Sequence, residues 1–305
     1  MIKLLVVGSI NMDLILRMEK VPSAGESMLC DTYRYAYGGK GANQAVAAAR
    51  LGAETTFAGK VGDDPVGGEL TGSLKALGIR TCYLTEKKNA GSGLAVIALE
   101  GNGQNRIMVF PESNMSLRPE DVDEAFQDPY DAMLIQFEIP RDVVIHACKT
   151  ALGKGIPFIV DAGPAQDFPI ESIPGAEIFT PNESETYAMC GIDVVDLQSA
   201  SDAAKLLKDR SGARYIVIKA GGNGAYLYDG RNTKHFAANK VNPVDTTAAG
   251  DAFTTAMAVE FLKTGSIERA ITFAGAAGAV AVTRLGAQPS LPTLGEVEAF
   301  IKSHT

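Results

Sequence analysis

The stretch from residue 132 to 219 contains four short apolar runs, Ala132-Met-Leu-Ile-Gln136, Pro157-Phe-Ile-Val160, Ile178-Phe-Thr180 and Tyr215-Ile-Val-Ile-Lys219. Segments with the character of helices separate these runs. Continuous apolar runs of this length are typical of strands that are buried on both faces, as in a parallel sheet covered by helices. The alternation therefore predicts an α/β fold, with a doubly wound, mostly parallel sheet flanked by helices.

The rest of the chain extends this pattern. Apolar runs at residues 4–8 and 55–61 predict two further strands, and the last third of the chain contains two long helical segments. Two irregular β segments, roughly 14–36 and 92–110, do not fit a parallel sheet. In the second of them, Glu100-Gly-Asn-Gly103 has the composition of a hairpin turn. We expect a single domain over residues 1–305, in which these two segments form a small β-sheet lid.

The composition is that of a globular protein with a large core, because 46% of the 305 residues are hydrophobic and 21% are charged. The net charge of −8 disfavours a surface that binds nucleic acid or an anionic membrane. No apolar stretch reaches the roughly 18 residues of a membrane span, and the N-terminus does not read as a signal peptide. The four cysteines form no Cys-x-x-Cys pair. These features argue against structural zinc and predict a cytoplasmic protein.

One candidate site is the segment Asp245-Thr-Thr-Ala-Ala-Gly-Asp251, which leads into an apolar helix. The small residues Ala248, Ala249 and Gly250 allow backbone N–H groups to converge at the positive end of the helix, which makes an anion hole. A carboxylate beside such a hole fits a base that takes a proton from a hydroxyl group attacking a phosphate. Asp251 could equally be an ordinary helix cap, because Asp is favoured there and in the first turn.

A second candidate is Gly38-Gly-Lys-Gly-Ala-Asn43, which opens a predicted helix at 44–51. Three glycines in four residues permit a ligand to approach the backbone closely. The segment is not a Walker A loop, because Arg34 stands where the first glycine of that motif is needed. A tight glycine turn that packs two elements together would explain the same residues.

Three further motifs lie near the ends of predicted strands. Asn11 and Asp13 follow the first strand, where a parallel sheet binds its ligands, and they would suit neighbouring hydroxyl groups or an ordinary turn. Asn182 and Glu185 have the spacing of a helix capping box, and also that of an amide and a carboxylate beside hydrated magnesium. The glycine-rich segment 219–224 could pass close to a nucleotide or merely turn a hairpin.

Together, these motifs resemble those of the ribokinase family of PfkB-type carbohydrate kinases, in the same order and over essentially the whole chain. The resemblance rests on Gly38-Gly-Lys-Gly-Ala-Asn-Gln-Ala-Val-Ala-Ala-Ala, Thr180-Pro-Asn-Glu-Ser-Glu185 and Asp245-Thr-Thr-Ala-Ala-Gly-Asp251. Asn11-x-Asp13, Gln136-Phe-Glu138 and the segment 282–290 support it.

The resemblance implies a doubly wound α/β fold with a β-sheet lid, through which two subunits form a homodimer. It implies ATP-dependent phosphorylation of D-ribose on the 5-hydroxyl, giving D-ribose 5-phosphate, with Mg²⁺ and K⁺ as metal ions. Kinases of the same family that act on deoxyribose, fructose, a keto-deoxy acid or a nucleoside are the alternatives. A protein that senses a sugar without turning it over is a further alternative, which the complete set of motifs disfavours.

By position, the resemblance also implies roles for individual residues. Asp251 would be the catalytic base, with Ala248, Ala249 and Gly250 as the anion hole. The sugar would be held by Asn11, Asp13, Gly39, Lys40, Asn43, Glu138 and Asp251. ATP would lie against Asn182, Lys219, Gly221, Gly222, Gly224, Gly250 and Gly275. Glu185 would help to place Mg²⁺ through water, and K⁺ would be held by Asp245, Thr247, Ala281, Arg284, Gly286 and Ser290.

Three positions depart from the pattern of the family. Ala248 stands where a glycine is frequent, Asp161 stands in a strand end that more often reads Asn-Pro-Ala-Pro-Ala, and Lys219 replaces a common threonine. The residue at 219 implies that contacts to ATP differ there. Neither Asp161 nor Lys219 alters a residue to which the resemblance gives a sugar-binding role.

Overall fold

A large sheet forms the centre of the protein, which is described here from a computed structural model over residues 1–30, 32–101 and 105–304. Its strands are β1 (Lys3–Val7), β4 (Glu54–Gly62), β5 (Arg80–Lys87), β8 (Ala132–Gln136), β9 (Phe158–Asp161), β10 (Ile178–Thr180), β11 (Tyr215–Lys219), β12 (Ala225–Tyr228) and β13 (Thr233–Phe236). They lie in the order β13-β12-β11-β10-β9-β8-β1-β4-β5, and all neighbours are parallel except β11–β12 and β12–β13. The four apolar runs between residues 132 and 219 are β8 to β11, so the expected α/β fold is confirmed.

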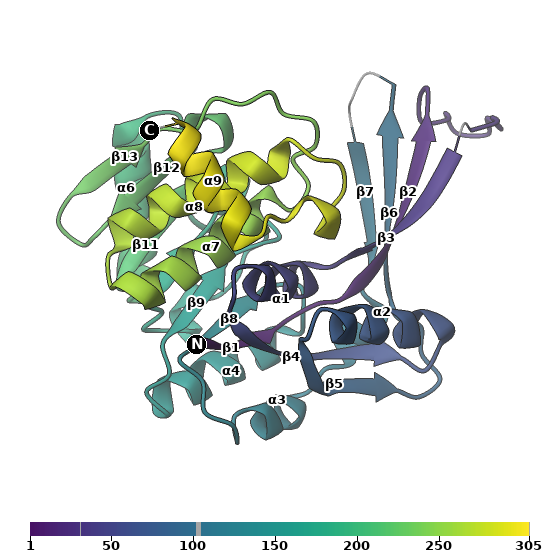
Figure 1. Cartoon of the computed structure of the whole chain (residues 1–305), viewed down its shortest axis with the longest axis horizontal. Helices are drawn as coiled ribbons and strands as arrows, with labels where there is room; N and C mark the ends of the chain where they lie inside the picture. The colour runs from purple at the N-terminus through teal and green to yellow at the C-terminus, as the bar shows by residue number, and fades with distance from the viewer. Residues whose placement is uncertain (31, 102–104, 305) are drawn as a thin grey trace.

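Two layers of helices cover this sheet, because side chains along each strand point alternately to its two faces (Figure 1). In β1, Leu4 and Val6 contribute to one hydrophobic core, whereas Leu5 and Val7 contribute to the other. The first core is closed by α1 (Lys40–Arg50), α2 (Pro65–Ala76), α7 (Ala249–Thr264), α8 (Ile267–Val282) and α9 (Leu294–His304). The second is closed by α3 (Pro119–Ala125), α4 (Arg141–Gly153), α5 (Glu183–Cys190) and α6 (Leu197–Ser211).

Short 3₁₀ helices complete the chain at η1 (Glu112–Ser116), η2 (Ile170–Ser172), η3 (Gly221–Asn223) and η4 (Gln288–Ser290). Among the residues that the structure describes, no helix is long and apolar enough to cross a membrane.

A second, smaller sheet stands to one side of the helical layers, at the right of Figure 1. Its strands are β2 (Asn11–Met18), β3 (Thr32–Gly38), β6 (Gly93–Glu100) and β7 (Asn105–Phe110), in the order β3-β2-β6-β7. These strands come from the two segments that do not fit the parallel pattern, and the sheet begins at Asn11, three residues before the expected start. Asp31 and residues 102–104, which include half of the expected hairpin turn, lie outside the described residues.

Helix α1 begins earlier than its sequence suggests, and glycines allow this. It starts at Lys40, four residues before the predicted start, so the segment 38–43 forms the entry and first turn of the helix. Gly39 has a φ of 87°, a conformation that favours glycine. A Cβ atom on Gly41 would lie 2.7 Å from backbone atoms of Gly8, at the end of β1. Helix α1 therefore packs directly on the strand end.

We expect Gly41→Ala to lower the free energy of unfolding by about 1–3 kcal/mol, because the added methyl group would collide with backbone atoms. Gly72→Ala is the matched control, since a Cβ on Gly72 in α2 would meet nothing within 4 Å. That substitution should raise the free energy of unfolding by up to about 1 kcal/mol. Urea-induced unfolding measures both. A Gly41→Ala protein as stable as the parent would show that α1 does not pack this closely.

Candidate active site

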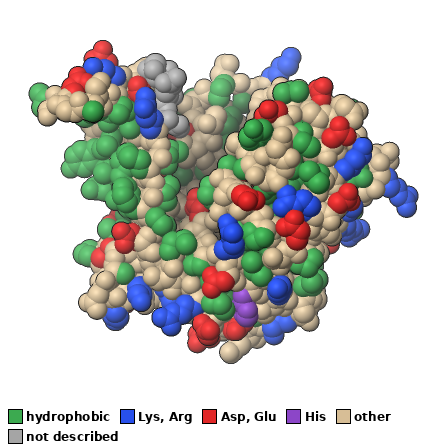
Figure 2. Space-filling view, turned by 180° about the vertical axis from the view of Figure 1, so that it is seen from behind, with side chains coloured by type: hydrophobic (Ala, Val, Ile, Leu, Met, Phe, Trp, Pro, Cys, Tyr) green, Lys and Arg blue, Asp and Glu red, His purple; other side chains and the backbone are tan. Residues whose placement is uncertain are grey.

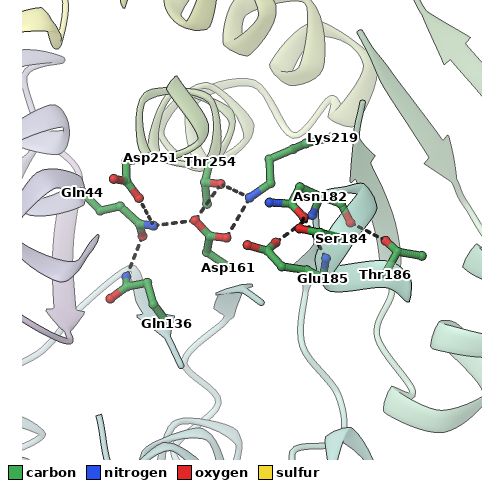
Figure 3. A network of polar contacts seen from close by, with 10 residues as sticks. All are labelled: Gln44, Gln136, Asp161, Asn182, Ser184, Glu185, Thr186, Lys219, Asp251 and Thr254. Carbon is green, nitrogen blue, oxygen red and sulfur yellow. Dashed lines mark hydrogen bonds and ion pairs between the residues drawn. The ribbon is translucent and has the colours of Figure 1, made fainter. Parts of the chain in front are cut away.

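Polar side chains collect at one edge of the large sheet, where its parallel strands end. Gln136, Asp161 and Lys219 are the last residues of β8, β9 and β11, and all three are buried. Helices α1 and α7 pack against each other, and hydrogen bonds from their side chains join this group (Figure 3). This edge is the place where parallel α/β sheets bind ligands.

Asp251 is not a cap of its own helix. The N-cap of α7 is Ala248, which makes no side-chain cap, and Asp251 is the third residue of the helix. Its carboxylate instead accepts hydrogen bonds from Asn43 Nδ2 at 2.9 Å and from Gln44 Nε2 at 3.2 Å. Two side chains of α1 thus hold Asp251 in place, which removes the capping explanation that the local sequence left open.

The surroundings of Asp251 make it a stronger base than an exposed carboxylate. The residue is only 4% exposed. Burial raises its pKa to about 6, and the negative charge of Asp161 adds a smaller increase, whereas the positive charge of Lys40 acts to lower it. A carboxylate of this pKa is ionised at pH 7 and holds a proton well once it receives one. This is the behaviour required of a general base near neutral pH.

The predicted sugar-binding residues lie beside Asp251. Asn11 and Asp13 are both buried in β2, and the strand continues through them, so their side chains point to the same face. Burial, together with the charges of Glu138 and Asp251, raises the pKa of Asp13 to about 7. A Cβ on Gly38 would lie 2.2 Å from Asp13 Oδ2. Only glycine at that position leaves room for the Asp13 carboxylate.

Glu138 is held on the same side of the site. Its Oε2 atom accepts hydrogen bonds from the Ser9 hydroxyl and, at 3.2 Å, from the backbone N–H of Lys40. Asn11 is fixed in a similar way, because its Oδ1 atom accepts a hydrogen bond of 2.8 Å from Asn114 Nδ2. The side chains that would contact a sugar are thus pre-positioned by neighbours.

The ammonium group of Lys40 lies among several carboxylates. Burial opposes its charge, but Asp161, Asp251, Glu185 and Glu138 outweigh this effect and raise the pKa of Lys40. A Cβ atom on Gly163 would lie 2.7 Å from Lys40 Nζ and 2.5 Å from Glu185 Oε1. The Lys40 ammonium and the Glu185 carboxylate therefore both lie next to Gly163, in space that a side chain there would occupy. Within the described residues, Lys40 forms no ion pair closer than 4.0 Å. Its charge remains available to an anionic ligand.

A cleft of about 430 Å³ separates the small sheet from the segment that precedes α7. Asp13 and Arg34 line it from the small sheet, and Asp245 and Thr247 line it from the opposite side. The cleft thus joins the predicted sugar-binding side to the segment that leads to Asp251.

The predicted nucleotide-binding residues lie at the ends of β10 and β11. Asn182 and Glu185 form a capping box at the start of α5, in which Glu185 Oε2 accepts from Asn182 N at 2.7 Å. Gly221 and Gly222, in η3, have open space around them. Gly224 has a φ of +93°, and a Cβ there would lie 2.0 Å from the carbonyl oxygen of Phe236, so the turn itself requires this glycine. In α8, the Cβ position of Gly275 is 3.4 Å from Asn239 Nδ2.

Three of the predicted cation-binding residues, Asp245, Thr247 and Gly286, meet at a second point, between α7 and the turn after α8. Asp245 Oδ1 accepts hydrogen bonds from the backbone N–H and hydroxyl groups of Thr247, at 2.9 and 2.6 Å, and Oδ2 accepts from Gly286 N at 2.8 Å. Arg284 N donates to the carbonyl of Ala281 at 3.1 Å. Buried Ser290 donates its hydroxyl hydrogen to a backbone carbonyl nearby.

The chemistry of this second point fits an alkali cation. From the described residues, no hydrogen bond reaches the carbonyl oxygens of Thr247, Arg284 or Gly286. Carbonyl oxygens are the ligands that K⁺ takes in proteins. The Arg284 guanidinium donates a hydrogen bond of 2.6 Å to Glu296. Its positive charge is thus paired with a carboxylate and does not compete with a cation for these carbonyl oxygens.

Sequence patterns alone did not single out several residues of the site. Gln44, Ser9 and Asn114 contact the predicted residues, but nothing in their local sequence distinguishes them from ordinary helix and loop residues. Asp161 was noticeable only as a departure from the family's pattern. Its position at the carboxyl end of a buried parallel strand was the available signal.

Comparison with known proteins shows the family to which the chain belongs. Residues 1–294 match the sequence profile described as pfkB family carbohydrate kinase. The chain is 38% identical to the ribokinase of Bacillus subtilis, over 97% of this chain and 98% of that protein, and 33% identical to the deoxyribokinase of Salmonella typhi, over 97% of each. The structure of Arabidopsis thaliana ribokinase complexed with ribose and ATP is 32% identical and superposes with a TM-score of 0.88, over 98% of each chain.

Similarity of sequence and similarity of structure therefore both extend over nearly the whole chain. The chain belongs to the pfkB family of carbohydrate kinases, which are enzymes that transfer a phosphoryl group to a hydroxyl group.

Proposed function

We propose that this enzyme phosphorylates D-ribose on its 5-hydroxyl group with ATP, giving D-ribose 5-phosphate and ADP. The observation that carries the proposal is the buried Asp251 carboxylate, held by Asn43 and Gln44 at the start of α7. The similarity to ribokinases at 36–38% identity supports ribose as the sugar. The kinase that acts on deoxyribose is the main alternative, since one such enzyme is 33% identical.

In this mechanism, Asp251 accepts the proton of the sugar hydroxyl as the hydroxyl oxygen bonds to the γ-phosphorus of ATP and the bond from that phosphorus to ADP breaks. The backbone N–H group of Gly250, with the positive end of the 16-residue helix α7, faces the charge on the transferred group. The N–H group of Ala249 already donates to the carbonyl of Thr246 at 3.2 Å, so it would have to exchange this partner to contribute. Ala248 turns the chain into this position with a φ of 59°. Lys40 adds a positive charge that no carboxylate of the described chain contacts. Positioning and neutralisation of charge are what phosphoryl transfer needs most.

We propose that Glu185 helps to place Mg²⁺ through water. Glu185 is 3% exposed, and its Oε2 atom is already occupied by the capping hydrogen bond. No hydrogen bond from the described residues reaches Oε1, which leaves one carboxylate oxygen for a hydrated ion. Mg²⁺ usually keeps several waters and takes few protein ligands. When bound, it would neutralise charge on the phosphate oxygens.

We further propose that the small sheet acts as a lid over the cleft and as the contact surface of a homodimer. Tyr35, Leu14, Val96 and Met108 lie in one row across the sheet and point away from the cleft, because the cleft is lined by the adjacent row. Tyr35 is 62% exposed and Met108 is 51% exposed, and hydrophobic side chains gather over this sheet in Figure 2. Exposed apolar patches of this kind mark interaction surfaces.

Sedimentation that detects only monomer at micromolar concentration would contradict the dimer.

We place the enzyme in the cytoplasm on the basis of its cysteines. Cys30 and Cys82 are free and exposed. Exposed free thiols suit a reducing compartment.

In an assay with ATP, Mg²⁺ and K⁺, we expect kcat/KM for D-ribose to exceed that for 2-deoxyribose by a factor of up to about 10⁴. A site that hydrogen-bonds a hydroxyl group leaves buried polar groups unpaired when the hydroxyl is missing. Coupled measurement of ADP over a panel of sugars gives the ratio, and ³¹P NMR of the product shows which oxygen carries the phosphate. A ratio near one, or phosphate on another oxygen, would reject ribose 5-phosphate as the product.

We expect K⁺ to activate the enzyme, since a cation beside Asp245 would stabilise the segment that leads into the anion hole. Replacing K⁺ by tetramethylammonium at constant ionic strength should lower kcat, and Asp245→Asn should weaken the response to K⁺. Glu296→Gln is the matched control, because Glu296 accepts hydrogen bonds from the Arg284 guanidinium and from Thr293, and from none of the other predicted cation-binding residues. Equal rates in both salts would show that the turn does not hold an activating cation.

A further inference from the structure

Behind Asp251 lies a buried ion pair that the proposed mechanism does not use. Lys219 Nζ donates a hydrogen bond of 2.7 Å to Asp161 Oδ1, and the two residues are 9% and 0% exposed. Thr254 of α7 lies 3.4 Å from both Lys219 Nζ and Asp161 Oδ2. These are two of the three positions at which the sequence departs from the family's pattern, and the structure brings them into contact. A buried charge pair is costly to form, and removal of one partner leaves the other charge buried without compensation.

One amide connects this pair to Asp251. Gln44 Nε2 donates to Asp161 Oδ2 at 2.8 Å and to Asp251 Oδ1 at 3.2 Å, so the same group bridges both carboxylates (Figure 3). Gln136 Nε2 donates to Gln44 Oε1 at 2.6 Å. That bond fixes the orientation of the Gln44 amide, because its oxygen faces Gln136 and its NH₂ group must then face the carboxylates.

We propose that Asp161 and Lys219 form a positioning pair that acts through Gln44 to set the orientation and ionisation of the Asp251 carboxylate. The inference rests on the proposed role of Asp251 as the base. Neither residue of the pair needs to touch the sugar. Asp161 holds one N–H of Gln44 so that the other is aimed at Asp251, and Lys219 balances the negative charge that Asp161 would otherwise add next to the base.

The charges around Asp251 explain why this balance matters. Lys40 on α1, Asp13 on β2 and Asp161 at the end of β9 interact with it electrostatically. Glu138, two residues after β8, acts on Asp13 and Lys40, and Lys219 at the end of β11 pairs with Asp161. Burial opposes the ionised form of Asp161, but Lys219 and Lys40 outweigh it and lower its pKa. Asp161 is therefore negative at neutral pH, and its charge raises the pKa of Asp251. Lys219 is the counter-charge: a Cβ on Gly250, next to Asp251, would lie 3.9 Å from Lys219 Nζ.

The pair makes opposite predictions for its two single variants. Asp161→Asn keeps an oxygen that can accept from Gln44 but removes the negative charge and leaves Lys219, so the pKa of Asp251 should fall. Lys219→Met removes the positive charge together with the hydrogen bonds to Asp161 and Thr254, so the pKa of Asp251 should rise. Each shift should be at least about half a unit, given an effective dielectric constant of about 20. The double variant removes both charges, so its pKa for Asp251 should lie between those of the two single variants and close to that of the parent.

The pH dependence of kcat/KM for the sugar at saturating ATP measures these shifts. Asp251 acts only when ionised, so activity is present above its pKa and is lost below it. The acid limb of the profile should therefore move to lower pH in Asp161→Asn and to higher pH in Lys219→Met. Asp121→Asn is the control for destabilisation, because it breaks the partly buried Lys60–Asp121 pair of 2.6 Å outside this network. It should leave the acid limb in place.

A second readout does not need turnover. In protein labelled with ¹³C at the Asp carboxyl carbons, the signal that Asp251→Asn abolishes reports the pKa of Asp251 directly. Opposite shifts in the two single variants, reversed in the double variant, would support the pair even if no sugar were phosphorylated, in which case only the proposed function fails. Shifts of the same sign, or none, would overturn the inference. So would a raised KM for ATP in Lys219→Met with an unchanged acid limb, since Lys219 would then act on the nucleotide instead.

Discussion

The hydrogen bonds that the amides of Asn43 and Gln44 donate to buried Asp251 are the contacts on which the site depends. They join the first helix of the chain to a helix that begins more than 200 residues later, and both helices must be close to the sheet for the bonds to form. The close approach of Gly41 to Gly8 brings α1 down onto the end of β1. The absence of a side chain at Gly38 leaves space for Asp13 on the neighbouring strand. Small residues at these positions thus determine where the carboxylates of the site lie.

The protein is acidic overall, with a net charge of −8, yet it belongs to a family whose enzymes bind a polyanionic nucleotide. Its positive field is supplied locally. The N-terminal end of α7 offers backbone N–H groups, and the Lys40 ammonium lies among four carboxylates without contacting any of them closely. Each carboxylate is in turn fixed by a donor, such as Ser9 for Glu138 or Gln44 for Asp251. Buried charges of both signs are tolerated here because nearly every one has a defined partner.

The fold was largely predictable from sequence, because the apolar runs of the strands and the long helices are local features. Helix α7 begins and ends at the predicted residues, Ala249 and Thr264. The start of α1 was predicted too late, since glycines at 38, 39 and 41 read as a loop while tertiary packing makes the segment from Lys40 helical. Whether Asp251 is a cap or a base could not be decided locally, because its partners are 207 and 208 residues away. For the same reason, the link from Asp161 to Asp251 through Gln44 became visible only in three dimensions.

The central claim is that Asp251 acts as the base and does not merely bind the sugar. It is tested most directly by measuring kcat and sugar affinity side by side in Asp251→Asn, which keeps the shape of the side chain and removes its charge. We expect kcat to fall by at least about 10²-fold, the usual contribution of a general base, while calorimetric titration still detects binding of D-ribose. A variant that retains near-normal turnover would contradict the account.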